Sequence, residues 1–135
     1  MVNAVHHINF IVRDLRAAIP AWERILDRPV DSRDRLETRG VDIARFELGG
    51  TWIVLVQPTG PGAPAEFLEA NGEGFFLMSL GVESVAVVAE RLGAALLDGD
   101  ARDGLDDWRV QDLDVAQTFG AQLQIVEVGS EPEVL

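Results

Sequence analysis

The sequence predicts an α+β fold built from two tandem βαβββ modules, and three observations lead to this prediction. Sliding the chain by 70 positions lays residues 7–18 over residues 77–88, and both segments alternate like a strand before they change to helical spacing. A small helix-capping residue, Asp14 or Ser84, stands at the same offset in both copies. Three further strand-like segments then follow in each copy. Neither half-sheet can bury its own apolar face, so we expect the two modules to pair and to form a cleft between them.

The elements of the first module follow from its apolar spacing and its turn residues. Asp14 caps a helix with apolar residues on one face, and Pro20 inside that helix removes one backbone hydrogen bond. Gly49 and Gly50 form a two-residue hairpin turn. The predicted order is a buried strand at 5–12, a helix at 14–27, a polar edge strand or loop at 28–35, and hairpin strands at 41–48 and 51–57.

The second module repeats this order after a joint at 58–64 that is rich in proline and glycine. Ser84 caps its main helix and Gly93 ends it. The predicted elements are a short helix at 65–70, a strand at 75–82, a helix at 84–92, a short strand at 96–97, an acidic loop at 99–107, and strands at 108–113 and 122–128. We therefore divide the chain into a module at 1–58, a linker with a short helix at 59–71, a module at 72–129 and a tail at 130–135.

The composition excludes several kinds of chemistry and several partners. All 11 basic residues are arginine, so neither a Schiff-base lysine nor the lysine of a phosphate-binding loop is present. The absence of cysteine and tyrosine removes thiol and phenol catalysis. A net charge of −12 repels nucleic acid and anionic membranes. With no signal-peptide pattern and no apolar run of about 20 residues, we expect a cytoplasmic protein.

Four segments carry a resemblance to a known family. They are HINFIVRDLRAA at 7–18, WIVLVQP at 52–58, FLEANGEG at 67–74 and IVEV at 125–128. With the duplicated βαβββ order, they resemble the vicinal oxygen chelate superfamily, which includes glyoxalase I, extradiol dioxygenases and bleomycin-resistance proteins. The segment at 67–74 is most similar to the methylmalonyl-CoA epimerase-like subgroup. The resemblance implies a curved mixed sheet around a central cleft, and a homodimer.

The resemblance also implies where a metal would bind. In metal-bearing members each module supplies two ligands, and the corresponding positions here are His7, Val54, Leu77 and Glu127. Only His7 and Glu127 carry donor atoms, and a catalytic metal usually needs about three protein ligands. His6 is adjacent to His7 and points to the opposite face of the strand. We therefore expect no divalent metal and no other cofactor, with His7 and Glu127 as vestiges of a metal site.

An arginine is predicted to project toward the vacated metal position. If Gly49 and Gly50 form the hairpin loop, Arg45 lies directly opposite Val54 on the same face of the sheet. Its guanidinium suits a planar group with two oxygens, so we take Arg45 as an anchor for a carboxylate, enolate or carbonyl. The alternative is that Arg45 lies near the rim and pairs with Glu47, Asp42 or solvent.

Two further residues are candidates for proton transfer. His7 has an unperturbed pKa near neutrality and is suited to act as acid or base. Glu127 has the same capacity if an apolar wall that includes Ile125 raises its pKa. Each has a structural alternative. His7 is then a core histidine bonded to neighbours such as Asn9 or Glu127, and Glu127 is a partner in an ion pair.

The remaining candidates would line the ligand site. Trp52 and Trp108 are stacking walls for a flat ligand or, alternatively, core residues. Asn9 and Ser79 stand two positions after His7 and Leu77 and offer polar contacts. The expected ligand-lining set is Asn9, Trp52, Val54, Leu77, Ser79 and Trp108.

Three functions are consistent with this pattern. The first is metal-independent isomerase or lyase chemistry on a small organic molecule in the cleft, by proton transfer with Arg45 as the oxyanion anchor. The second is a non-catalytic protein that binds a drug or metabolite, as bleomycin-resistance proteins do. A metal-dependent epimerase or glyoxalase is the third and fits the residues least well. The sequence alone does not decide whether the protein is an enzyme.

Overall fold

The computed structural model describes residues 1–104 and 107–128, and it confirms the α+β class. The chain forms two compact units, one of residues 7–76 and one that joins residues 1–6 to the part of the chain from residue 77 onward. The predicted tail at 130–135 lies outside the described residues. Within the described ranges, no helix is long and apolar enough to cross a membrane.

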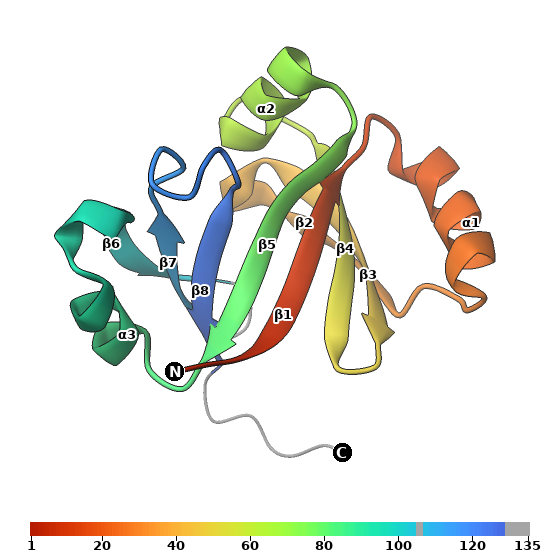
Figure 1. The fold of residues 1–135 in the computed structure, drawn as a ribbon. Helices are drawn as coiled ribbons and strands as arrows, with labels where there is room; N and C mark the ends of the chain where they lie inside the picture. Colours follow the sequence, from red (N-terminus) through yellow and green to blue (C-terminus); the bar gives the residue numbers. More distant parts are fainter. Residues whose placement is uncertain (105–106, 129–135) are drawn as a thin grey trace. The chain divides into compact units, whose positions relative to one another are not determined.

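The unit of residues 7–76 contains a four-stranded mixed sheet in the order β2-β3-β4-β1. Its strands β1, β4 and β3 are seen next to one another in Figure 1. Strands β1 and β4 are parallel, and the other two pairs are antiparallel. The polar segment at 28–35, predicted as either an edge strand or a loop, contains the start of an edge strand, β2. The elements are β1 (Val2–Ile11), α1 (Leu15–Leu26), β2 (Ser32–Leu36), a 3-10 turn (Glu37–Arg39), β3 (Val41–Leu48), β4 (Thr51–Pro58) and α2 (Ala63–Asn71).

The β3–β4 hairpin has the register that the sequence predicts. Gly49 and Gly50 form its turn with φ angles of 61° and 96°, a left-handed backbone that glycine adopts without steric cost. Leu48 therefore pairs with Thr51, and Arg45 pairs with Val54. This register fixes which side chains of β3 and β4 share a face.

Helix α1 covers one face of this sheet. Its N-cap is Asp14, whose side chain accepts a hydrogen bond from the backbone N–H of Arg16 at 3.0 Å. Pro20 lies inside the helix, which nevertheless continues to Leu26. The core between helix and sheet consists of Val12, Leu15, Ile19, Ala44, Phe46, Ile53 and Leu55.

The other unit repeats this arrangement. Its strands follow the order β5-β8-β7-β6, and the first residues of β1 lie beside β5. Strands β5 and β8 are parallel, whereas β7 pairs antiparallel with both β8 and β6. Val82, Val85, Val88 and Ile125 form the core under its helix. The elements are β5 (Gly74–Val82), α3 (Val85–Leu92), a 3-10 turn (Ala94–Leu96), β6 (Leu97–Asp103), β7 (Arg109–Leu113) and β8 (Leu123–Glu127).

The acidic loop predicted at 99–107 is a strand over much of its length. β6 extends to Asp103, and residues 105–106 lie outside the described part of the chain. Two of its charged residues form ion pairs across the strand pair: Arg102 donates to Asp112 at 2.6 Å, and Asp103 accepts from Arg109 at 3.1 Å. As the edge strand of its sheet, β6 keeps such charges in contact with solvent. The acidic pattern of this segment predicted a loop because it does not indicate the backbone pairing with β7.

Candidate functional site

The polar candidates of the first module lie together on the face of the sheet turned away from α1. Side chains alternate between the two faces of a strand, and paired residues share a face. Because Phe46, Ile53 and Leu55 pack under α1, their strand neighbours point to the other side. We call this side the Arg45 face. It carries His7, Asn9 and Ile11 from β1, Trp52, Val54 and Val56 from β4, Ile43, Arg45 and Glu47 from β3, and Ser32 and Asp34 from β2.

Arg45 is held in one orientation by three neighbours. Its Nε donates to the Oγ of Ser32 at 3.1 Å, and its guanidinium carbon lies 5.0 Å from the ring centroid of Trp52. One terminal nitrogen lies 3.9 Å from a carboxylate oxygen of Asp34. Only 15% of the Arg45 side chain is exposed. A cation stacked on a tryptophan and bonded at Nε is pre-organised, so it loses little freedom when it binds an anion.

The two carboxylates considered in the sequence analysis as partners of Arg45 also bond to other residues. Glu47 accepts a hydrogen bond from the backbone N–H of Gly50 at 2.7 Å, which ties it to the hairpin turn. Asp42 forms a two-bond ion pair with Arg35, at 2.7 and 3.0 Å. The hydrogen bond from Arg35 is the main reason that the pKa of Asp42 is held below its usual value.

His7 and Asn9 complete this face on β1. His7 is 5% exposed and pairs in register with Trp52, the residue over which the Arg45 guanidinium lies. Asn9 pairs with Val54, which in turn pairs with Arg45. The Oδ1 atom of Asn9 is buried and accepts no hydrogen bond from any residue in the described ranges. The structure thus places His7, Asn9, Arg45, Trp52 and Val54 on one face of the sheet.

The second module carries a row of polar side chains at equivalent positions, but its groups bond to one another. Adding 70 to Asn9 and Val54 gives Ser79 and Gln124. Ser79 is fully buried, and its hydroxyl donates to Oε1 of Gln124 at 3.0 Å. The amide of Gln124 donates to Asp112 at 3.1 Å, and Asp112 accepts from Arg102. Leu77 lies two residues before Ser79, on the same face of β5.

Glu127 lies elsewhere in the second module, on the side of the sheet covered by α3. Its Oε1 accepts a hydrogen bond from the backbone N–H of Val85, the first residue of that helix, at 2.8 Å. The first module contains the same bond, because Gln57 accepts from the N–H of Leu15 at 2.7 Å. The two donors, Leu15 and Val85, are 70 residues apart, and so are the two acceptors. The internal repeat therefore extends to side-chain contacts. Glu127 and Ile125 do share an apolar wall, but that wall faces the helix.

Truncation of Glu127 is therefore expected to weaken the start of α3. Glu127→Ala should cost about 1–2 kcal/mol of unfolding free energy, because it removes an acceptor and a negative charge at a helix N-terminus. Glu127→Gln keeps the acceptor and should cost less than about 1 kcal/mol. Urea unfolding followed by circular dichroism measures both variants, and Gln57→Ala is the matched change in the first module. Equal midpoints for Glu127→Ala and the wild type would show that the bond does not contribute.

Trp108 and His6 form an aromatic pair in the second unit. Their rings meet edge to face with centroids 4.5 Å apart, and Trp108 also packs against Val110 and Val126. Burial lowers the pKa of His6 below the usual value of histidine, so the ring favours its neutral form. Trp108 is only 7% exposed and is a core residue of its unit.

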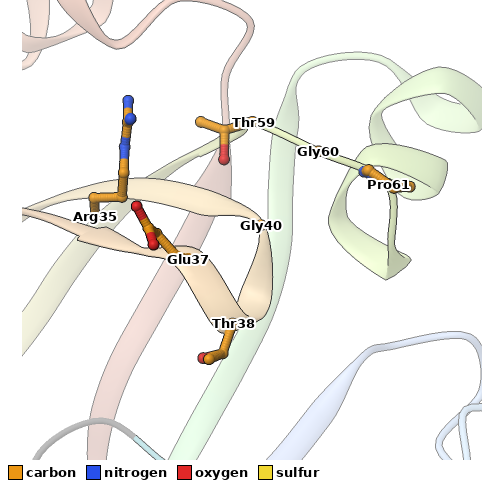
Figure 2. Close-up of a pocket in the computed structure, with 7 residues that line it drawn as sticks. All are labelled: Arg35, Glu37, Thr38, Gly40, Thr59, Gly60 and Pro61. Atoms are coloured by element: carbon orange, nitrogen blue, oxygen red, sulfur yellow. The ribbon is translucent and has the colours of Figure 1, made fainter.

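An open hollow lies at the end of the β2–β3 hairpin. Figure 2 shows that Arg35 and Glu37 approach it from the hairpin and Thr59 from the segment before α2. The backbone N–H of Thr59 donates to the carbonyl of Gly40 at 2.7 Å, which holds the two segments together. Arg35 is already paired with Asp42, so its positive charge is partly neutralised and attracts an anion to this hollow less strongly. The full lining is Arg35, Glu37, Thr38, Gly40, Thr59, Gly60 and Pro61.

The residues of the Arg45 face do not fit a divalent cation. Val54 offers no donor atom, and the residue directly opposite it is a guanidinium, whose charge repels a metal ion. Over residues 1–104 and 107–128, no three His, Asp or Glu side chains gather in a way that can hold a metal. The donor set here suits an anion instead.

Sequence reasoning missed several residues of these polar rows. Ser32 and Asp34 were overlooked because the sequence did not decide whether their segment is a strand or a loop. Their register with Arg45 was therefore unknown. Gln124 was overlooked although the sequence contained its signal, since the 70-residue shift applied to Val54 gives position 124 and not 127. Asp112 and Arg102 can be recognised as members of the second polar row only once the pairing of β6, β7 and β8 is known.

The chain belongs to the Glyoxalase/Bleomycin resistance protein/Dioxygenase superfamily, whose family model matches residues 6–111. Within this family it is similar to the mitochondrial methylmalonyl-CoA epimerase of Homo sapiens, with 28% identity over 95 residues, which are 70% of this chain and 51% of the human protein. The chain thus spans about half the length of that relative. It is also 23% identical to the uncharacterized protein YqjC of Bacillus subtilis, over 93% of each chain.

Solved structures show the same fold. A variant of the Streptomyces coelicolor methylmalonyl-CoA epimerase, in complex with 2-nitronate-propionyl-CoA, superposes with a TM-score of 0.87 at 22% identity. The superposition covers 96% of this chain and 97% of that one. At this level of identity the likeness establishes the fold alone.

Proposed function

We propose that the protein binds a small organic acid or ester on the Arg45 face and catalyses an isomerase or lyase reaction by proton transfer, without a metal. The observation that carries this proposal is the fixed guanidinium of Arg45, stacked on Trp52 and bonded to Ser32 opposite the donor-free Val54. An oriented cation on a largely buried face stabilises negative charge that develops on a carbonyl oxygen.

In the proposed reaction His7 takes a proton from the carbon next to the ligand carbonyl. The electron pair of the broken C–H bond moves to the carbonyl oxygen, and the resulting enolate is held by Arg45. Return of a proton to the carbon completes an isomerisation. In a lyase reaction the enolate electron pair instead forms a carbon–carbon double bond, and the β-substituent leaves with the electron pair of its own bond. His7 is suited to this step because its register partner is Trp52, beside the guanidinium. Glu127 is left out of this scheme because its carboxylate bonds the start of α3.

The first substrate class to test is an acyl-CoA thioester with an acidic α-carbon. The Streptomyces coelicolor relative binds 2-nitronate-propionyl-CoA, and the human relative is a methylmalonyl-CoA epimerase. The net charge of −12 works against an anion as large as coenzyme A, so small 2-oxo and 2-hydroxy acids belong in the same test.

Non-catalytic binding is the second candidate, and the occupied donors of Arg45 favour it. Because Nε already bonds Ser32 and a terminal nitrogen lies near Asp34, fewer donors remain to follow a charge that grows during a reaction. A binding protein needs only that the cation be oriented.

Exchange of the α-proton with deuterium oxide separates these functions. We expect the protein to accelerate deuterium incorporation into methylmalonyl-CoA or a small 2-oxo acid, measured by mass spectrometry, with no loss of rate in EDTA. Saturable binding by calorimetry without incorporation would establish the non-catalytic alternative. Incorporation that EDTA abolishes and a divalent cation restores would contradict the metal-free mechanism.

A further inference from the structure

We infer that Asn9 is a second anchor of the same site and that the ligand is a hydroxy acid, which Asn9 recognises through its hydroxyl group. This inference rests on the proposed function, because it assigns a second contact to a ligand whose anion is bound by Arg45. The observation behind it is the buried Oδ1 of Asn9, which has no partner among the described residues. Buried polar atoms are nearly always hydrogen-bonded, so an orphaned acceptor on a candidate site indicates a missing donor.

The repeat shows that this acceptor is not an unavoidable feature of the fold. In the second module the corresponding neighbours, Ser79 and Gln124, satisfy each other at 3.0 Å. In the first module the neighbour of Asn9 is Val54, which cannot form a hydrogen bond. The same two positions thus share a hydrogen bond in one module, whereas in the other the buried Oδ1 of Asn9 has no partner among the described residues. A polar group left open at a cost in stability is typical of a binding site.

The register places the two anchors at opposite ends of one short row. Asn9, Val54 and Arg45 stand side by side on adjacent strands, so the Cα atoms of Asn9 and Arg45 are about 10 Å apart. A ligand that reaches both anchors must pass an apolar segment over the side chain of Val54. It therefore carries an anionic group at one end and a hydrogen-bonding group at the other.

A hydroxyl is the hydrogen-bonding group that fits best. The oxygen and nitrogen of an asparagine amide exchange places by a simple flip, so either can face the ligand. A hydroxyl both donates and accepts, and it satisfies Asn9 in either orientation. An ammonium or a second carboxylate satisfies only one of them.

The test compares matched acids that differ in one hydroxyl. Butyrate and its 2-, 3- and 4-hydroxy derivatives are titrated into the intact wild-type protein, Asn9→Leu and Arg45→Met, and binding is followed by NMR. We expect the wild type to bind at least one hydroxybutyrate about 10-fold more tightly than butyrate. Asn9→Leu should keep butyrate binding and lose this preference, whereas Arg45→Met should lose affinity for all four acids.

The outcomes separate the two proposals. Equal affinities for butyrate and all its hydroxy derivatives in the wild type, or an unchanged preference in Asn9→Leu, would overturn the role of Asn9 alone. Failure of the wild type to bind any of the acids, or binding that Arg45→Met does not weaken, would overturn the anion site itself.

Thermal stability gives an independent readout. If Asn9 serves the ligand and not the fold, Asn9→Leu should leave the melting temperature of the free protein unchanged or raise it. Ser79→Ala is the matched control, since Ser79 is buried with its hydroxyl bonded, and its melting temperature should fall. A melting temperature that falls as far in Asn9→Leu as in Ser79→Ala would show that Asn9 is structural.

Discussion

Arg45→Met is expected to weaken binding of a carboxylate or oxyanion ligand about 100-fold, which corresponds to about 2.7 kcal/mol. A guanidinium that donates two hydrogen bonds to an anion in a poorly solvated place supplies an interaction of this size. Methionine keeps an apolar side chain over Trp52 and removes only the charge and the donors. Isothermal titration with the tightest-binding acid or thioester measures the effect, and the turnover of any substrate should fall at least as much.

Three variants show whether the effect comes from the guanidinium itself. Arg45→Lys keeps the charge without the planar fork, so its affinity should lie between those of the wild type and Arg45→Met. Ser32→Ala removes the bond to Nε and should weaken binding less than 10-fold, because it only loosens the orientation of the cation. Arg35→Met removes an arginine of the same sheet whose side chain is 62% exposed, and it should leave affinity unchanged.

Equal losses of ligand affinity in Arg45→Met and Arg35→Met would mean that anions are attracted by the overall electrostatic potential of the protein and not by a specific site. Normal affinity in Arg45→Met, with an unfolding midpoint like that of the wild type, would show that the ligand binds elsewhere.

The sequence predicted the part of this site that depends on local rules. A two-glycine turn sets the register of the β3–β4 hairpin, so the pairing of Arg45 with Val54 follows from the positions of Gly49 and Gly50. The capping residues Asp14 and Ser84 likewise mark where α1 and α3 begin. Such features need only neighbouring residues and can be worked out from one chain.

The parts that could not be predicted depend on contacts between distant strands. The segment that becomes β2 is polar because it is an edge strand, and nothing in its own pattern shows that Ser32 pairs with Arg45. The strand character of β6 depends on its backbone pairing with β7, a distant segment that the acidic sequence of β6 does not indicate. Glu127 shows a different limit. It was chosen by analogy with a ligand position, whereas the internal 70-residue shift equates it with Gln57, another acceptor at a helix start.

The second large effect is expected at the residue next to Arg45. Phe46 points to the opposite face of β3, is completely buried and packs in the core beneath α1. Phe46→Ala should lower the unfolding free energy by about 3–5 kcal/mol, because it removes apolar contacts and leaves a cavity. Native domains have a total stability of about 5–15 kcal/mol, so the variant should still fold at low temperature. Urea unfolding measures the loss, and Leu48→Ala, at a 37% exposed position of the same strand, should cost less than about 1 kcal/mol.

The comparison of Phe46→Ala with Arg45→Met tests the assignment of the two faces. Consecutive residues of a strand point in opposite directions, so the two substitutions should have opposite profiles. Phe46→Ala should lose stability and retain most of its ligand affinity at low temperature, whereas Arg45→Met should lose affinity and retain most of its stability. If Phe46→Ala abolishes binding while still folded, or if Arg45→Met unfolds the protein, the separation of a core face from a ligand face on β3 is wrong. The binding role of Arg45 would then have to be replaced by a structural one.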